Sequence, residues 1–366
     1  MKPLCLPKIQ MKIAILYQKN PAPVVDGILK PTKEGGYADS GADIAFSLKR
    51  QGFDVILPIA LPDVLTDLDW VFPDTEEGIQ HAIDLGADTF WLNTVLYRDH
   101  PIEKFINKGF SVVGQIPSLV DVYDDKIKTN VLLSNNGLKI PAYRLIGSEK
   151  TDWLKIGLPF PLVVKPIRGR GSQGVKLVVT EKELLNSLED MFEAAIFGDK
   201  VYVEEFLAGE EITISVMPPG KYEINGSDIS KPGYWCLPPV KRMNHKDGIA
   251  PYNGVVAVTQ NSIVMEDAEV LEPNVQSAMK MCVVAARLVQ ARAVIRIDCR
   301  ADDRGNFYLF DLNMKPNMTG ASRPHRSDQD SLTAIASRKI GWSFDDFLRN
   351  MLNQCWSLEQ GFEKPL

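Results

Sequence analysis

Cysteine is scarce in this chain and is never closely spaced. The 366 residues contain five cysteines (Cys5, Cys236, Cys282, Cys299 and Cys355), with no C-x-x-C pair and no short cysteine–histidine spacing. This distribution indicates neither a zinc site nor a disulfide framework. Cysteines scattered over apolar segments predict reduced, mostly buried thiols in a cytoplasmic protein.

Long apolar runs and an excess of positive charge are also absent. No segment approaches the roughly 18 to 20 apolar residues that span a bilayer, so no membrane association is expected. The net charge of −6 argues against a nucleic-acid partner, because the basic footprint for a phosphate backbone is missing. A hydrophobic content of 45% with 24% charged residues predicts a soluble globular protein, and the length predicts more than one domain.

The first third of the chain alternates predicted strands with predicted helices. Short apolar runs at 11–17, 53–59, 88–94 and 111–115 predict strands, and helical patterns lie between them. This alternation is typical of a parallel sheet covered on both faces. We therefore expect an N-terminal α/β domain at residues 1–120.

The rest of the chain mixes strands and helices differently, which predicts α+β lobes. A helix ending at Asn136-Gly137 and a helix starting at the cap Thr180 alternate with strands at 159–167, 174–179 and 200–207. Further strands are predicted at 211–217, 253–258, 293–300 and 306–313. We divide this part into a central lobe, 121–205, and a C-terminal lobe, 206–366.

A glycine-rich loop in the central lobe has the spacing of a nucleotide site. Gly169, Gly171 and Gly174 satisfy G-x-G-x-x-G, but a dinucleotide loop must run from a strand into a helix. Here the apolar segment after Gly174 predicts a strand, so the glycines are expected to form a flap over phosphates. Lys165 precedes the loop, unlike the lysine of protein kinases, and Val175 excludes a Walker A loop. A mobile surface hairpin is the alternative.

An acidic hairpin is predicted near residue 300. Strand alternation places Arg296 and Asp298 on one face, and Asp311 and Asn313 on one face of the partner strand. If these faces coincide, sparse hard oxygen ligands converge in a way that suits Mg²⁺ with substrate phosphates. The alternative is a structural Asp–Arg salt bridge.

In this order, the motifs resemble those of the ATP-grasp superfamily, most closely the D-alanine–D-alanine ligase branch. The resemblance runs from about Met11 to Leu352 and is specific from Asp125 onward. It implies an ATP-grasp fold behind the N-terminal parallel-sheet domain, with ATP in a cleft between two lobes. It also implies one or two Mg²⁺ ions, with Mn²⁺ as an alternative.

The resemblance assigns a nucleotide role to residues along the two lobes. Lys126 and Lys165 would reach the phosphates, and Glu204 and Glu211 would accept from the adenine amino group and the ribose hydroxyls. The remaining assignments are Gly171, Ser172, Gln173 and Gly174 for the flap, and Glu205, Phe206 and Leu207 for the adenine edge.

The segments RIDCR and FDLNMKPNMTG resemble the family's R-x-D and E-x-N-x-x-P-G-x-T signatures. Asp298, Asp311 and Asn313 would then hold Mg²⁺, and Arg296 would stabilise charge in the transition state. Asp311 stands where the family has Glu, which leaves the number of metal ions open. Asn317 stands where the family has Gly, and we expect Asn to tolerate a positive φ there.

The substrate half departs further from the family. Glu34 is the nearest counterpart of the glutamate that takes the first substrate's ammonium. Ser322 aligns with the serine that binds the second substrate's carboxylate, but the basic residues Arg323, His325 and Arg326 follow it. These side chains suggest an extra carboxylate or phosphate on a substrate, or else a solvated basic loop.

A basic stretch between two strands has the position of the family's mobile loop. One of Lys241, Arg242, His245 and Lys246 is expected to close over the γ-phosphate, and Lys246 is our candidate for a catalytic role.

The resemblance implies an ATP-dependent ligase that joins a small-molecule carboxylate to an amine, with amino acids as the expected substrates. The carboxylate would be activated as an acyl phosphate, so no nucleophilic serine is needed, and the chain has no G-x-S-x-G. Alternatives are a biotin-carboxylase-like enzyme that activates bicarbonate and a nucleotide sensor without turnover. The resemblance also allows a homodimer.

Overall fold

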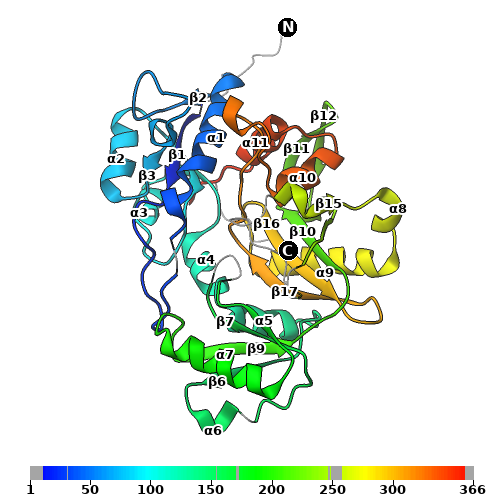
Figure 1. The fold of residues 1–366 in the computed structure, drawn as a ribbon. Coiled ribbons are helices and arrows are strands. Elements are labelled where there is room, and N and C mark those ends of the chain that lie inside the picture. Colours follow the sequence, from blue (N-terminus) through cyan, green and yellow to red (C-terminus); the bar gives the residue numbers. More distant parts are fainter. Residues whose placement is uncertain are drawn as a thin grey trace.

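The structure is a computed structural model that describes residues 11–30, 32–153, 155–169, 173–245, 248 and 258–358. Three larger sheets, with their helices, form its three parts (Figure 1). The N-terminal part lies beside the C-terminal part, and the central part lies below them in this view. Within the described ranges, no helix has the length and apolarity needed to cross a membrane.

The N-terminal sheet is parallel, as the alternation of strands and helices predicts. Its order is β2-β1-β4-β5, and β3 also pairs with β1. The strands are β1 (Lys12–Tyr17), β2 (Asp54–Val55), β3 (Phe72–Pro73), β4 (Thr89–Asn93) and β5 (Ser111–Val113). The helices are η1 (Glu34–Tyr37), α1 (Ala38–Arg50), η2 (Asp67–Asp69), α2 (Glu76–Asp84), α3 (Ile102–Ile106) and α4 (Pro117–Tyr123).

The strand predicted at 53–59 is much shorter than expected. After β2, the Ile56 N–H still bonds to the Ile13 carbonyl at 2.8 Å, and the pairing then stops before Pro58, which has no N–H to donate. The strand β3 was not expected at all. It takes the place beside the second half of β1, where Leu16 pairs with Phe72.

The central sheet is antiparallel, in the order β6-β9-β7-β8. Its elements are α5 (Lys126–Asn135), β6 (Tyr143–Gly147), α6 (Lys150–Trp153), β7 (Leu162–Pro166), β8 (Lys176–Val178), α7 (Glu181–Glu193) and β9 (Lys200–Glu205). β7 and β8 pair directly, which confirms the strand–loop–strand context of the glycine loop. Gly174 has φ +72°, and a Cβ there would lie 2.9 Å from the Phe197 ring, so glycine is required.

The C-terminal sheet has the order β15-β14-β10-β16-β17, and β13 pairs with β10. Its strands are β10 (Glu211–Met217), β13 (Trp235–Cys236), β14 (Val240–Arg242), β15 (Ser262–Val264), β16 (Ile295–Ala301) and β17 (Phe307–Asn313), and β11 (Gly220–Ile224) pairs separately with β12 (Ser227–Lys231). The helices are η3 (Val258–Gln260), α8 (Asp267–Val270), α9 (Pro273–Leu288), η4 (Pro324–Arg326), α10 (Leu332–Lys339) and α11 (Phe344–Leu352). The strand predicted at 253–258 lies outside the described residues except for Val258, which begins η3.

The cysteines of the described ranges are free thiols, in line with the scattered spacing. Cys282 of α9 and Cys299 of β16 bring their Sγ atoms to 3.6 Å inside the apolar layer between helix and sheet. Burial raises the pKa of the Cys282 thiol well above its usual range, so this thiol stays protonated and behaves as a small apolar side chain.

Candidate active site

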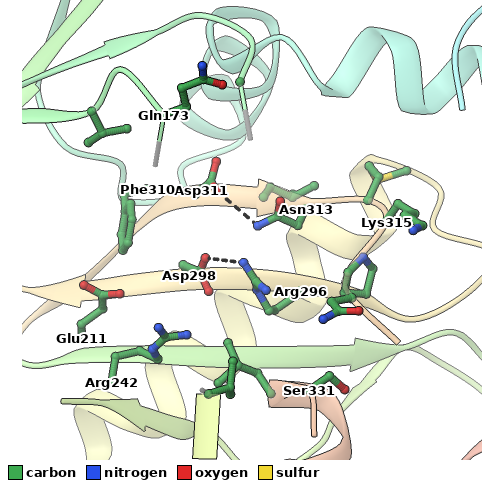
Figure 2. A pocket seen from close by; sticks show the side chains of 18 of the residues that line it. Gln173, Glu211, Arg242, Arg296, Asp298, Phe310, Asp311, Asn313, Lys315 and Ser331 are labelled. Atoms are coloured by element: carbon green, nitrogen blue, oxygen red, sulfur yellow. Dashed lines mark hydrogen bonds and ion pairs between the residues drawn. The ribbon is translucent and has the colours of Figure 1, made fainter. Parts of the chain in front are cut away.

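A cavity of about 560 Å³ lies where the three parts meet. Side chains from all three parts line it, and Figure 2 shows a section of its wall. Lys165 and Asp311, which come from different sheets, line this same cavity. Most of the residues proposed from the sequence also line it: Lys126, Gln173, Glu204, Glu205, Phe206, Leu207, Glu211, Arg296, Asp298 and Asn313.

The acidic hairpin forms one wall of the cavity. Asp298 on β16 pairs directly with Asp311 on β17, and Arg296 pairs with Asn313. A β-bulge follows between Asp298 and Cys299 and shifts the register. The two strand faces therefore coincide, and their carboxylates and amide meet at one place (Figure 2).

Cations from neighbouring elements surround these carboxylates. Lys126 Nζ lies 2.9 Å from Asp311 Oδ1, and Arg296 Nη2 donates to Asp298 Oδ2 at 3.1 Å. Thr213 Oγ1 donates to the other oxygen of Asp298 at 2.6 Å. Both carboxylates are therefore compensated by groups of the protein itself, as partly buried acids require.

The pKa values of the two carboxylates are shifted in opposite directions. Burial opposes ionisation of Asp311, yet Lys126, Lys165 and Arg296 together lower its pKa to about 2. Burial raises the pKa of Asp298, Arg296 lowers it, and the neighbouring charge of Asp311 raises it again. A divalent cation between these groups would relieve their repulsion.

These residues fit a magnesium ion. Two carboxylates and the Asn313 amide offer hard oxygen donors and leave room for phosphate oxygens, which suits Mg²⁺. Across the described ranges, no group of three or more His, Cys, Asp and Glu side chains is placed to hold a metal.

Lys165 lies deep in the cavity between the central and C-terminal sheets. Its Nζ donates to Glu204 Oε1 at 2.6 Å and to the Phe310 carbonyl at 3.2 Å. Burial raises the pKa of Glu204, and Lys165 is the main charge that opposes this shift. Glu204 Oε2 is buried without a hydrogen-bond donor among the described residues, which leaves one acceptor for a ligand.

The segment after Glu204 has fewer free backbone groups than the sequence suggests. The N–H of Glu205 bonds to the Ala142 carbonyl, and the N–H of Phe206 bonds to the Pro161 carbonyl at 3.1 Å. These two donors are not available to a ligand while they stay paired. Glu211 holds His245 at 2.9 Å and Arg300 at 3.5 Å.

The flap and the basic stretch are described in part. Gly169, Gln173 and Val175 line the cavity, whereas Gly174 packs beside Phe197. Gly171 and Ser172 lie outside the described residues, as does Lys246. Among the other candidates for closing over a phosphate, Arg242 lines the cavity, His245 bonds to Glu211, and Lys241 pairs with Glu210 and Glu269.

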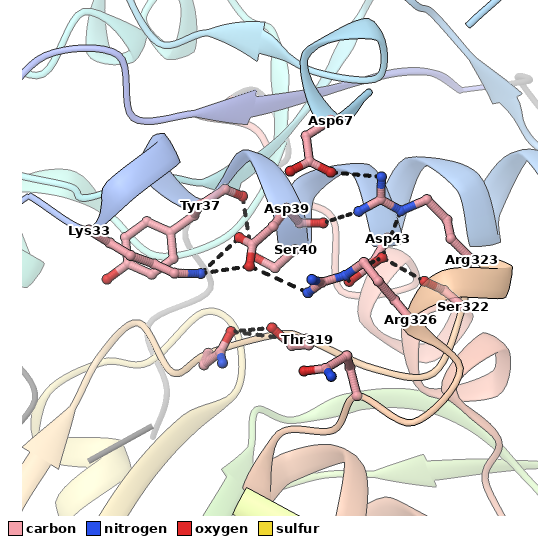
Figure 3. Close-up of polar contacts among 12 residues, drawn as sticks. Lys33, Tyr37, Asp39, Ser40, Asp43, Asp67, Thr319, Ser322, Arg323 and Arg326 are labelled. Carbon is pink, nitrogen blue, oxygen red and sulfur yellow. Dashed lines mark hydrogen bonds and ion pairs between the residues drawn. The ribbon is translucent and has the colours of Figure 1, made fainter. Parts of the chain in front are cut away.

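Ser322 and Arg323 face the protein interior and not the cavity. Ser322 Oγ donates to Asp43 Oδ1 at 2.8 Å, and Arg323 Nε donates to the same oxygen at 2.9 Å (Figure 3). Asp43 and Arg323 are both 0% exposed. Arg323 also pairs with Asp67 at 2.7 Å. Arg323 thus joins the N-terminal and C-terminal parts. Both predictions for Arg323 are therefore wrong, because it is neither placed to bind a substrate nor exposed to solvent.

Sequence reasoning missed several residues at this end of the cavity. Glu34 is not among the lining residues, but Lys33, Tyr37, Asp39 and Lys315 are. Asp39 and Asp43 stand one helical turn apart at the start of α1, which marks an acidic helix face that needs cations. That spacing was the available signal. Asn317 does not adopt a positive φ; its Oδ1 accepts from the N–H and Oγ1 of Thr319.

The fold and the paired lysines and carboxylates define an ATP-grasp protein. A D-alanine–D-alanine ligase crystal structure from Bacillus anthracis aligns with a TM-score of 0.63 and 20% identity, over 94% of this chain and 97% of that one. A second, complexed with ATP, aligns with a TM-score of 0.59 and 22% identity, over 94% and 96%.

Residues 132–353 match the family described as D-ala D-ala ligase C-terminus, and the chain belongs to this family. A D-alanine–D-alanine ligase from Psychrobacter is 30% identical over 63% of this chain and 61% of its own length. The chain therefore spans about three fifths of that curated relative.

The buried Asp43 predicts a large stability effect. Replacing Asp43 with alanine leaves Arg323 without its main counter-charge in the interior, so we expect a loss of about 3–5 kcal/mol in the free energy of unfolding, measured in urea. Glu189→Ala is the control, because its pair with Lys150 is exposed and is worth about 0–1 kcal/mol. A loss at Asp43 no larger than the control would contradict the role given to this pair.

The Lys165–Glu204 pair predicts a pH-dependent penalty. In Lys165→Met, Glu204 loses the charge that opposes its raised pKa, so the folded state holds its proton more strongly than the unfolded state does. A carboxyl group with a raised pKa stabilises the folded state below its ordinary pKa of 4.5. This stabilisation is lost as pH rises through the raised pKa. The variant should thus lose more stability at pH 8 than at pH 5 in urea unfolding. Lys150→Met should show no such difference, and an equal penalty at both pH values for Lys165→Met would refute the assignment.

Proposed function

We propose that the protein is an ATP-dependent ligase that activates a small-molecule carboxylate as an acyl phosphate and joins it to an amine. The observation that carries this proposal is the convergence of Lys126 and Lys165 with Asp298 and Asp311 on one cavity. Membership in the D-alanine–D-alanine ligase family supports a carboxylate–amine ligase over bicarbonate activation. Amino acids are the substrates we propose.

ATP would lie across the junction of the central and C-terminal parts. The buried Oε2 of Glu204 is suited to accept from the adenine amino group, and Leu207 and the neighbouring carbonyls would read the ring edge. Glu211 would hold the ribose hydroxyls. Gly169, Gln173 and the flap residues Gly171, Ser172 and Gly174 would cover the phosphates with backbone N–H groups.

Transfer of the γ-phosphoryl group needs charge compensation and alignment more than covalent help. Lys126 and Lys165 would bind phosphate oxygens, and Arg296 would stabilise the charge that develops during transfer and during attack by the amine. Asp298, Asp311 and Asn313 would hold Mg²⁺, which supplies neutralisation and orientation of the phosphates. Lys246 remains a candidate for closing the cavity against water, which would otherwise hydrolyse the acyl phosphate.

A nucleotide sensor without turnover is the competing function. It needs ATP binding but not the cations and carboxylates for phosphoryl transfer, and the meeting of Lys126, Lys165, Arg296, Asp298 and Asp311 at one cavity favours the ligase. Purified protein would be given ATP, Mg²⁺ and pools of amino acids of both configurations, while phosphate release and new amides are followed by a coupled assay and mass spectrometry. Substrate-stimulated phosphate release with a new amide supports the ligase. ATP binding with no turnover on any pool would favour the sensor.

Charge removal at the acidic hairpin should abolish this turnover. We expect Asp311→Asn to lower the rate at least about 10²-fold, because the lost charge serves both metal and Lys126. Removing Mg²⁺ with EDTA should have a similar effect, which Mg²⁺ or Mn²⁺ would reverse. Lys104→Ala, at an exposed surface pair, is the control and should keep full activity. A fully active Asp311→Asn protein would overturn the metal assignment.

A further inference from the structure

One end of the cavity is lined by residues of η1, α1 and η4 and is built around the Asp39 carboxylate. Lys33 Nζ lies 2.8 Å from both oxygens of Asp39, and Arg326 Nη2 lies 3.4 Å from Oδ2 (Figure 3). Lys33, Asp39 and Arg326 all line the cavity. Lys33 and Arg326, which are far apart in the sequence, thus both bind the Asp39 carboxylate at the cavity wall.

The charges of this cluster divide into an interior part and a cavity part. In the interior, Asp43 is matched by Arg323, and both are fully buried. At the cavity, Lys33 and Arg326 keep 31% and 18% of their side-chain surface exposed and share the single carboxylate of Asp39. Arg326 also pairs with Asp43, and Arg323 also pairs with Asp67, so the charges of the cluster balance within the protein. Lys33 and Arg326 are the two of its cations that stay partly exposed at the cavity.

Arg326 has donors left for a ligand. The hydrogen bonds that the described residues give it use Nε, toward Asp43, and Nη2, toward Asp39. A guanidinium carries five N–H donors, and the two on Nη1 have no acceptor among the described contacts. Lys315 adds a further cation to this end and lies 3.5 Å from the centre of the Tyr37 ring.

The acidic side chains described further along the wall do not pair with Lys33 or Arg326. Asp330 also lines the cavity, but it pairs with Arg338. Asp328 lines the cavity and accepts from the Gln329 side chain at 3.2 Å. Neither acid has an ion pair with Lys33 or Arg326 among the described contacts.

We infer that Lys33 and Arg326 form a clamp for a substrate carboxylate that does not react, and that this clamp takes the place of Ser322. The inference rests on the proposed ligase function. Ser322 cannot hold a substrate in this arrangement, because its hydroxyl donates to the buried Asp43. Either the amine substrate is an amino acid whose carboxylate binds here, or the acid substrate is a dicarboxylate with one group activated and the other clamped. In both cases the clamp selects against substrates that lack this second charge.

Binding of succinate, with its neutral counterpart succinamide, tests the clamp without any turnover. Calorimetry of the whole protein should show saturable succinate binding and none of succinamide. Lys33→Met and Arg326→Gln should each weaken succinate about tenfold to hundredfold, the expected loss for a charge-assisted contact. Arg326→Gln should still fold, because Asp43 keeps Arg323 and Ser322. Lys33→Met serves as the second variant, since Lys33 is partly exposed.

Two further variants sharpen the result. Asp39→Asn removes the internal carboxylate that occupies the clamp and should tighten succinate binding. Arg50→Gln is the control, because Arg50 is half exposed at the end of α1 and pairs with Asp345. Absent succinate binding, equal binding of succinamide, or unchanged binding in Lys33→Met and Arg326→Gln would each overturn the clamp.

A turnover experiment then identifies which substrate the clamp holds. Each productive acid and amine would be compared with the form in which its non-reacting carboxylate is a carboxamide. The substrate whose KM rises about tenfold or more in wild-type protein, but not in Arg326→Gln, is the one that is clamped. If succinate follows the expected pattern while no pool supports turnover, the ligase proposal fails and the clamp stands. If turnover proceeds while the succinate pattern is absent, the clamp fails alone.

Discussion

The placement of two carboxylates opposite each other inside a sheet is the constraint on which the cavity depends. Asp298 and Asp311 pair across β16 and β17, and neighbouring cations meet their charges because both side chains are partly withdrawn from water. Arg296 comes from the same hairpin, but Lys126 comes from α5 at the edge of the central part. Lys165 of β7 adds a hydrogen bond to the backbone of β17 at Phe310. The electrostatics of one hairpin therefore fix how the central part meets the C-terminal sheet.

The same charges explain why a nucleotide would require a divalent cation here. Lys126, Lys165 and Arg296 are each already paired, with Asp311, Glu204 and Asp298 respectively. A triphosphate that entered this balanced set alone would add several negative charges without matching positive ones. A metal ion held by the hairpin carboxylates removes that conflict, and it does so beside the lysines that would bind the phosphates. The hairpin carboxylates, which protein cations compensate here, would then serve metal and phosphates together.

Local patterns predicted the acidic hairpin and the two strands that flank the glycine-rich loop. The two-residue period placed Arg296 with Asp298 on one face of β16 and Asp311 with Asn313 on one face of β17, and the register in the structure brings the two faces together. The β-branched run after Gly174 was enough to predict a strand there. The other features depend on contacts between residues far apart in the sequence, which local patterns do not reveal. The strand β3 is two residues long and exists only through its partner β1, so no periodicity marks it. Arg323 was predicted either to bind a substrate anion or to lie in a solvated loop, because its partner Asp43 is 280 positions away in sequence.

Asp43 bonds to two arginines with different roles: Arg323 stabilises the fold, and Arg326 lies at the cavity where a substrate would bind. Both arginines bond to Asp43. They can do so because residues three apart lie on the same side of a 3₁₀ turn. Arg323 then continues into the interior toward the carbonyls of Val64 and Asp39, whereas Arg326 continues to the Asp39 side chain at the cavity. Loss of Arg326 leaves Asp43 with Arg323 and Ser322, but loss of Arg323 leaves a cavity-facing guanidinium as the only remaining cation for a fully buried acid. Substrate preference can therefore change at Lys33 and Arg326 at little expense in stability, while Asp43 and Arg323 must stay together.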